Sequence, residues 1–282
     1  ANGETVLVAD DAVAPAAMPA GAAAAVSVGE RTRTGDGAGA SARESALGAL
    51  PAWDPSLGTL DLVVVGMGPA GLSAAEEASR RGMRVVVVEP RPNAAWPNNY
   101  GVWIDEFEAM GLEDCIDTEW QRAKVQFTEK EEASVLDRKY GRVNRRRLKD
   151  RLLKGCVANG VVFHAARAVG VTHAERWRSA VKCSDGAEVL GAAVLDGTGH
   201  ARSLVEFEGE FDPGYQGAYG IMIEVESHPF ELDTMFFMDW RDDHLAGDVS
   251  MRERNAALPT FLYTMPFSPT RIFVEETSLV AK

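Results

Sequence analysis

Two adjacent carboxylates near the end of the sequence, Glu275 and Glu276, are residues of the type that acid–base catalysis requires. Neighbouring carboxyl groups can differ in pKa, so that one holds a proton that the other has lost. The stretch RIFVEETS around them is typical of a strand, in which successive side chains point to opposite faces. We therefore expect one glutamate to face a reaction pocket and the other to be structural or solvated.

Asp239 and Asp242 are further carboxylates that could move a proton. For Asp239, an ion pair with Arg241 or another cation is an equally good interpretation. From Gly214 onward, aromatic and methionine residues become frequent. Their π-faces could stabilise a cation and their bulk could bury a long hydrocarbon, although ordinary core packing explains most of them.

A glycine-rich motif is the strongest local signal in the chain. It consists of Gly66, Met67, Gly68, Pro69, Ala70 and Gly71. It follows an apolar run, LDLVVVG, that predicts a buried parallel strand, and it opens a predicted helix over 69–81. Gly66 would allow a tight turn, Gly68 a close approach of a pyrophosphate, and Gly71 close packing of the helix on the sheet. The free N–H groups of the helix would bind the phosphates.

The stretch MRVVVVE at 83–89 predicts the second strand of a βαβ unit, and Glu89 at its end would accept hydrogen bonds from a ribose hydroxyl. An arginine-rich helix is predicted directly after Asn144. Three strand-like stretches follow, within residues 161–197, and Asp185-Gly186 is a hairpin signal between the last two.

Composition excludes some functions. The net charge of −13 over 282 residues argues against a nucleic-acid partner, which requires clustered cations. Cys115, Cys156 and Cys183 lack close metal-ligand spacing, so we expect reduced thiols and no metal site. Apolar runs are too short for a membrane-spanning helix. Residues 1–59, rich in alanine and glycine, fit a disordered extension or the remains of a transit peptide.

Longer stretches resemble plant and algal lycopene cyclases of the β type rather than the ε type. The matching stretches are PNNYGVW (97–103), DEF (105–107), YGRVNR (140–145), FMDWRD (237–242), PTFLY (259–263), MPF (265–267) and RIFVEET (271–277). Val274 stands where the family usually has leucine. The resemblance covers essentially everything from Leu60 to Lys282, and the family continues past Lys282. The chain is therefore expected to be a fragment.

The resemblance implies an α/β fold: a Rossmann-like FAD-binding domain with an interleaved β-sheet substrate domain, as in FAD-dependent hydroxylases and isoprenoid reductases. We expect the FAD-binding domain over residues 60–213 and the start of the substrate domain over 214–282. In such enzymes an arginine at the start of the helix, here Arg145, contacts the cofactor. A D-x-x-G turn, here Asp196 to Gly199, packs near the flavin. A solvated helix face remains the interpretation for at least two of the three arginines at 145–147.

The resemblance also implies an activity. The family protonates the terminal C1=C2 bond of lycopene or another linear carotene, and the C5=C6 bond attacks the cation at C1. Loss of a proton from C6 then leaves a β-ring. FAD is expected in its reduced form, with NADPH as the electron source and no net redox change, and its ring could stabilise the cation or shuttle the proton.

Plastid residence, peripheral membrane contact and other carotenoid-pathway enzymes as partners follow from the same resemblance. The alternatives are an ε-cyclase, another FAD-dependent isoprenoid enzyme, or a truncated chain without turnover.

Overall fold

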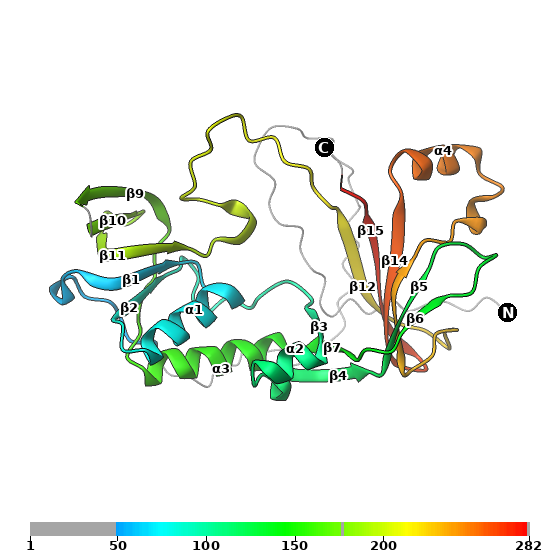
Figure 1. Cartoon of the computed structure of the whole chain (residues 1–282), viewed down its shortest axis with the longest axis horizontal. Helices are drawn as coiled ribbons and strands as arrows, with labels where there is room; N and C mark the ends of the chain where they lie inside the picture. The colour runs from blue at the N-terminus through cyan, green and yellow to red at the C-terminus, as the bar shows by residue number, and fades with distance from the viewer. Residues whose placement is uncertain (1–48, 176–177, 281–282) are drawn as a thin grey trace, which may run out of the picture.

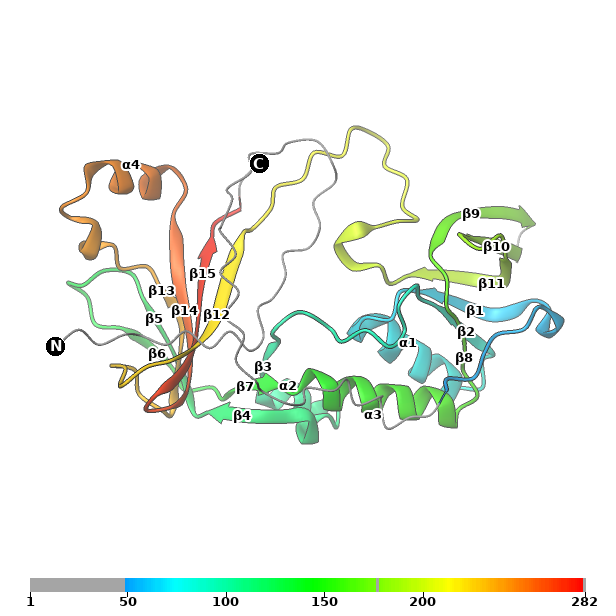
Figure 2. The same ribbon diagram turned by 180° about the vertical axis from the view of Figure 1, so that it is seen from behind.

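The computed structural model describes residues 49–175 and 178–280, which form two lobes joined by a small sheet (Figure 1). Most of the extension expected over residues 1–59 lies outside the described residues. Figure 2 shows the same two lobes from behind, with the helix α3 running from the first lobe towards the joining sheet. Short 3₁₀ helices occupy Pro55–Leu57, Glu113–Cys115, Gly199–Ala201 and Asp243–Leu245.

The first lobe, here called the nucleotide lobe, is built on a six-stranded sheet of order β8-β2-β1-β11-β10-β9. Its elements are β1 (Leu60–Val65), α1 (Pro69–Arg80), β2 (Val85–Val88), α3 (Arg145–Ala158), β8 (Val162–His164), β9 (Ala168–Glu175), β10 (Arg178–Cys183) and β11 (Glu188–Asp196). Strand β1 pairs in parallel with β2 and β11, whereas β10 pairs antiparallel with β9 and β11. The βαβ unit and the hairpin predicted from the sequence are confirmed.

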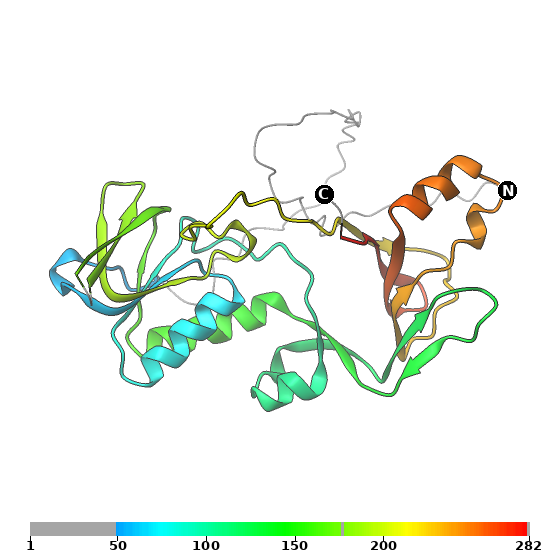
Figure 3. The ribbon, with the colours of Figure 1, turned by 45° about the horizontal axis from the view of Figure 1, so that its top comes forward.

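The valines of β1 and β2 are buried on both faces of this sheet, as their continuous apolar runs predict. Val64 and Val87 pack under α1 and α3, in a cluster with Leu72 and Leu152. The alternate residues, such as Val63, face the opposite side and pack against the β10–β11 hairpin. Figure 3 shows the two helices together on one side of the sheet.

One predicted strand proves to be two. The strand-like stretch at 161–173 contains β8 and most of β9, which lie at opposite edges of the sheet. The chain leaves β8 after His164, whose carbonyl oxygen accepts a hydrogen bond from the Ala166 N–H at 3.0 Å. It then crosses to the antiparallel layer. Hydrophobicity continues through the crossing because Ala166 is itself buried, so no local pattern marks the break.

The joining sheet has the order β3-β7-β4. Its strands are β3 (Gly101–Trp103), β4 (Ile116–Trp120) and β7 (Tyr140–Val143), with the short helix α2 (Ile104–Ala109) after β3. Strand β7 leads directly into α3, because Asn144 caps that helix by accepting a hydrogen bond from the Arg147 N–H at 3.0 Å. The joining sheet is therefore continuous with the nucleotide lobe.

The second lobe, here called the sheet lobe, has the strand order β12-β15-β14-β13-β5-β6. Its elements are β5 (Arg122–Gln126), β6 (Ser134–Leu136), β12 (Ala218–Glu224), β13 (Thr234–Asp239), α4 (Val249–Ala257), β14 (Thr260–Ser268) and β15 (Arg271–Ser278). Strands β5 and β6 come from inside the expected domain 60–213, yet β5 pairs in parallel with β13. The boundary expected near residue 213 therefore does not separate the two sheets.

None of the described helices combines the length and the apolar character that a membrane crossing needs.

Candidate cofactor and acid–base site

The glycine-rich loop between β1 and α1 has the conformation that its glycines were predicted to allow. Gly66 has a φ of +99°, and a Cβ there would lie 2.5 Å from the carbonyl oxygen of Gly197. A Cβ at Gly71 would collide with the carbonyl oxygen of Gly66. These two positions pack the loop tightly against the end of β11 and against α1, and larger side chains do not fit there.

Gly68 differs from its neighbours because the space above it is open. It is the N-cap of α1, and a Cβ built there would meet nothing within 4 Å. Pro69 and Ala70 begin the helix, so the free N–H groups of its first turn lie beside this space. An exposed helix N-terminus with room above a glycine fits a pyrophosphate, so the residues present suit a bound dinucleotide.

Glu89 lies directly beneath the loop. Its carboxylate accepts hydrogen bonds from the Met67 N–H at 3.2 Å and from the Arg91 N–H at 3.0 Å. The side chain remains partly exposed, and each carboxylate oxygen has a second lone pair for a ribose hydroxyl. Glu89 therefore has two tasks: it shapes the loop and it offers an acceptor beside it.

The turn after β11 lies against the same loop. The Asp196 carboxylate accepts hydrogen bonds from the Thr198 N–H at 2.9 Å and from the Leu204 N–H at 2.9 Å. Gly199 has a φ of +67°, and the Gly197 N–H donates to the Val65 carbonyl oxygen at 2.7 Å. The carboxylate of Asp196 thus organises a turn that lies beside the glycine-rich loop.

Arg145 is the first residue of α3 and faces the second lobe. Its guanidinium donates to the carbonyl oxygens of Pro97 at 2.7 Å and Asn98 at 3.1 Å. It also lines a cavity of about 260 Å³ between the lobes. This interlobe cavity is bounded by Asn99, Asp117, Arg142, Val143, Asn144, Arg145, Arg146, Met222 and Phe273. Arg147 instead donates to the Asp114 carbonyl oxygen at 2.7 Å, so Arg145 and Arg147 have different surroundings.

Glu275 points to the interlobe side of the sheet lobe. It lies on β15, on the same face as Phe273, which lines the interlobe cavity. Its half-buried carboxylate accepts a hydrogen bond from the Thr277 hydroxyl at 3.1 Å. Burial raises the pKa of the Glu275 carboxyl above its ordinary value. A carboxyl that keeps its proton next to apolar side chains can act as an acid.

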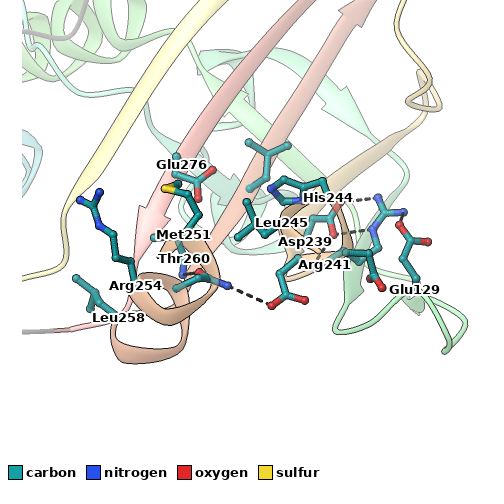
Figure 4. Close-up of a pocket in the computed structure, with 14 residues that line it drawn as sticks. Glu129, Asp239, Arg241, His244, Leu245, Met251, Arg254, Leu258, Thr260 and Glu276 are labelled. Carbon is teal, nitrogen blue, oxygen red and sulfur yellow. Dashed lines mark hydrogen bonds and ion pairs between the residues drawn. The ribbon is translucent and has the colours of Figure 1, made fainter. Parts of the chain in front are cut away.

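Glu276 points the other way, into a cavity of about 630 Å³ between the sheet and α4. This outer cavity also contains Asp239, Asp242 and Arg241 (Figure 4). Both oxygens of Asp239 are held by Arg241, at 2.8 Å from Nε and 2.6 Å from Nη2. The ion pair expected as one alternative for Asp239 is therefore present, and it commits the carboxylate to a cation. The structure does not bring Glu275 together with Glu276 and Asp239.

Comparison with known proteins identifies the family of this chain. The family model described as "Lycopene cyclase protein" matches residues 61–282. The chain belongs to the lycopene cyclase family. It is 52% identical over 234 residues to lycopene beta cyclase of Capsicum annuum and 52% identical over 234 residues to that of Arabidopsis thaliana, with 83% of this chain covered in each case. It spans about half the length of these relatives, 47% and 46% respectively.

Solved structures agree on the fold of this family member. A geranylgeranyl bacteriochlorophyll reductase-like protein from Thermoplasma acidophilum matches with a TM-score of 0.55 at 17% identity, over 78% of this chain and 56% of that one. Aklavinone-11 hydroxylase, solved with FAD and aklavinone, matches with a TM-score of 0.52 at 16% identity, over 77% of this chain and 45% of that one. The α/β, Rossmann-like fold with an interleaved sheet, expected from the sequence, is confirmed.

Two tyrosines near Glu275 were missed as site residues. The Tyr263 hydroxyl donates to the Tyr140 hydroxyl at 3.4 Å, and Tyr263 is the cross-strand partner of Glu275. Burial raises the pKa of both phenols, that of Tyr263 well above its usual value. Both residues stand in the stretches that carry the family resemblance, YGRVNR and PTFLY. Their meeting depends on the packing of β7 against β14, for which a single strand gives no local signal.

Proposed function

We propose that the whole protein to which this chain contributes is a lycopene β-cyclase, which closes β-rings on lycopene and other linear carotenes. The identities support this choice: 51–55% to lycopene beta cyclases and 46% and 49% to capsanthin/capsorubin synthases. The observation that carries the proposal is Glu275, a half-buried acid on the interlobe face of the sheet, beside aromatic rings. Ring closure requires an acid of this kind.

In the proposed mechanism, Glu275 provides the proton for the terminal C1=C2 bond of the carotene. The C5=C6 bond attacks the resulting cation at C1, which forms the ring, and a proton then leaves C6. Having lost its own proton, the Glu275 carboxylate can accept this one, so that no atom is gained or lost overall. The raised pKa caused by burial keeps more of the acid protonated at the start of the reaction.

The aromatic cluster beside Glu275 supplies the surroundings that a cation needs. The rings of Trp103 and Phe237 lie with their centroids 5.0 and 5.6 Å from that of Tyr140, and the ring of Tyr263 lies 6.1 Å from Phe237. The electron-rich faces of aromatic rings attract cations, and their bulk excludes water that would trap a carbocation. We propose that these rings surround the reacting end of the carotene.

FAD is the proposed cofactor, held by Gly66 to Gly71, Glu89, Arg145 and the turn from Asp196 to Gly199. Reduced FAD, with NADPH as its electron source, would supply an electron-rich ring close to the cation without net redox change. The role of the chain is to bind the phosphates at the N-terminus of α1 and to anchor the ribose at Glu89. The open space above Gly68 is the geometric support for this assignment.

A plastid location is proposed because the relatives are named chloroplastic or chromoplastic. Peripheral membrane contact is proposed because the substrate is a hydrocarbon. Exposed apolar side chains at the β5–β6 edge, Phe127, Val135 and Leu136, support such a contact. Other carotenoid-pathway enzymes would be its neighbours there, as suppliers of the linear carotene.

The test is pigment analysis in bacteria that accumulate lycopene and express the full-length protein. We expect γ-carotene and β-carotene at the expense of lycopene. Rings of the ε type would transfer the assignment to an ε-cyclase. Unchanged lycopene, with soluble protein and bound flavin, would contradict ring closure altogether. Expression of the 282-residue chain alone, in parallel, tests whether this part turns over without the rest.

A further inference from the structure

Three side chains with metal-binding atoms meet in the nucleotide lobe, away from the proposed cofactor loop. They are His164 at the end of β8, Cys183 at the end of β10, and Asp185 in the turn between β10 and β11. The imidazole nitrogen, the thiol sulfur and a carboxylate oxygen all lie within 4.8 Å of one another. Sequence spacing could not reveal this group, because His164 is far from the other two along the chain.

The imidazole of His164 lies beside the carboxylate of Asp185. Its Nε2 atom is buried and faces the carboxylate of Asp185. Asp185 Oδ2 lies 3.1 Å away, in an ion pair if the imidazole is protonated. The other carboxylate oxygen, Oδ1, accepts from the Ala187 N–H at 3.1 Å. That bond fixes the carboxylate in the turn and directs its second oxygen towards His164.

The cysteine is a free thiol in the apolar core of this lobe. Cys183 is buried, with 5% of its surface exposed, and its sulfur is 3.9 Å from the Val181 carbonyl oxygen. Its backbone closes the same turn, since the Gly186 N–H donates to the Cys183 carbonyl oxygen at 3.0 Å. Cys183 and Asp185 are therefore held by one rigid turn, and they face the end of β8 together.

We propose that His164, Cys183 and Asp185 form a zinc site with water as the fourth ligand. Nitrogen, sulfur and oxygen donors together suit Zn²⁺, with bonds of about 2.0–2.3 Å in a tetrahedron. Such bonds place neighbouring ligand atoms about 3.3–3.7 Å apart, so ligand atoms that now lie within 4.8 Å of one another need to approach by about 1.5 Å at most. His164 Nε2 and Asp185 Oδ2 already lie 3.1 Å apart, so the sulfur of Cys183 makes most of this approach. Binding replaces the thiol proton of Cys183 by a sulfur–zinc bond, and the proton leaves to solvent.

The zinc site would connect two parts of the nucleotide lobe, the end of β8 and the turn between β10 and β11. In the strand order, β2 and β1 separate β8 from the β10–β11 hairpin, yet the turn of that hairpin meets the end of β8. Zinc would tie the hairpin turn to the end of β8, whose last carbonyl oxygen, that of His164, accepts from the Glu89 N–H at 3.1 Å. The metal would thus restrict movement at the ends of β8 and β2, and Glu89 directly follows β2. This inference does not depend on ring closure.

The experiment measures Zn²⁺ binding to the purified 282-residue chain by competition with a chromophoric chelator. We expect one zinc per chain at micromolar or lower concentration and a thermal midpoint several degrees higher with Zn²⁺ than with EDTA. Cys183→Ser and His164→Gln should each weaken zinc binding at least tenfold. Cys156→Ser, which alters a buried thiol on α3, is the matched control and should bind zinc as wild type does.

Asp185→Asn keeps the test decisive if the buried variants do not fold, because this side chain is exposed. It should retain the wild-type circular dichroism spectrum and lose zinc affinity. A second measurement uses Co²⁺, which should show a thiolate charge-transfer band and quench the fluorescence of Trp53, whose ring centroid lies 4.9 Å from that of His164. Absence of stoichiometric binding in wild type would overturn the proposal. Wild-type zinc affinity in folded Asp185→Asn and Cys183→Ser would do the same.

Discussion

Glu275 and Glu276 are neighbours in the chain but have opposite surroundings. Glu275 shares a face with Phe273 and lies across from Tyr263, whereas Glu276 lines the outer cavity with Asp239. Alternation along a strand predicted this separation from the sequence alone. Which glutamate faces the other lobe could not be predicted, because that depends on which face of the sheet packs against the joining sheet.

The separation leads to unequal effects of two isosteric substitutions. In the full-length protein, Glu275→Gln should reduce ring closure on the order of a hundredfold or more, as loss of a catalytic acid does. Glu276→Gln should reduce ring closure much less, because Glu276 lies on the opposite face of the sheet and lines the outer cavity. Pigment chromatography from carotene-producing cells measures both, with flavin content as the control for folding. A greater loss with Glu276→Gln would move the chemistry to the outer cavity and to Asp239.

The pKa of Glu275 also predicts how stability depends on pH. Burial raises the folded-state pKa of Glu275 above its ordinary value, so the folded state binds the proton more tightly than the unfolded state does. Stability from this group is present below about pH 4.5 and is lost as pH rises through the folded pKa. Wild type should therefore lose stability relative to Glu275→Gln across that interval. Chemical denaturation at several pH values measures the difference.

Gly68 is the residue at which cofactor binding can be tested most directly. Because nothing lies within 4 Å of a Cβ built there, Gly68→Val should fold normally while its side chain fills the space proposed for the pyrophosphate. Flavin absorbance after purification should fall to background. Gly170→Val is the control, since Gly170 on β9 also has open space around it. Wild-type flavin content in Gly68→Val would contradict the assignment of the loop.

At the scale of elements, the sequence predicts what local pattern determines. The buried strand β1, the helices α1 and α3, and the β10–β11 hairpin all have strong local signals: a valine run, a glycine-rich start, a capping Asn144 and an Asp-Gly turn. The short strands β3, β5 and β6 have no comparable signal. Strand β5 is placed by its pairing with β13, more than a hundred residues later in the printed sequence. Long-range pairing of this kind depends on the assembled core.

The N-terminus of α3 is an element whose stability and function are coupled. Asn144 caps it through Arg147, and Arg145, the first helical residue, is a proposed cofactor contact. Asn144→Ala should lower the free energy of unfolding by about 1 kcal/mol. It should also weaken flavin binding, because the first turn loses its fixed position. Asn144→Asp retains a capping oxygen and should restore most of both. Urea denaturation and flavin titration measure the two effects. Wild-type unfolding free energy and wild-type flavin affinity in Asn144→Ala would show that the cap contributes to neither.

At the scale of the molecule, the joining sheet determines how the two lobes meet. Its strand β4 ends at Trp120, which is fully buried in a cluster with Met235, Met265 and Phe273 of the sheet lobe. The nucleotide lobe is continuous with the same small sheet through β7 and α3. The position of Glu275 relative to the cofactor loop therefore depends on packing at this junction, which no local sequence pattern encodes.

Trp120 and Trp240 provide a matched test of that junction. The Trp120 indole N–H donates to the Pro266 carbonyl oxygen at 2.9 Å, whereas the buried Trp240 N–H has no partner among the described residues. Trp120→Phe leaves a carbonyl oxygen without its donor, which costs about 1–3 kcal/mol beyond the lost contacts. Trp240→Phe removes a donor that has no partner among the described residues, so it should lower the free energy of unfolding less than Trp120→Phe does.

The functional consequence of Trp120→Phe should differ between the lobes. Flavin content should change little, because the cofactor loop lies on the nucleotide lobe. Ring closure should fall, because β14 and β15 are no longer held in place against the joining sheet and Glu275 loses its fixed position. Denaturation curves, flavin absorbance and pigment analysis on the full-length protein separate these effects. Equal loss of stability in Trp120→Phe and Trp240→Phe, with ring closure intact in both, would show that the joining sheet does not position the acid.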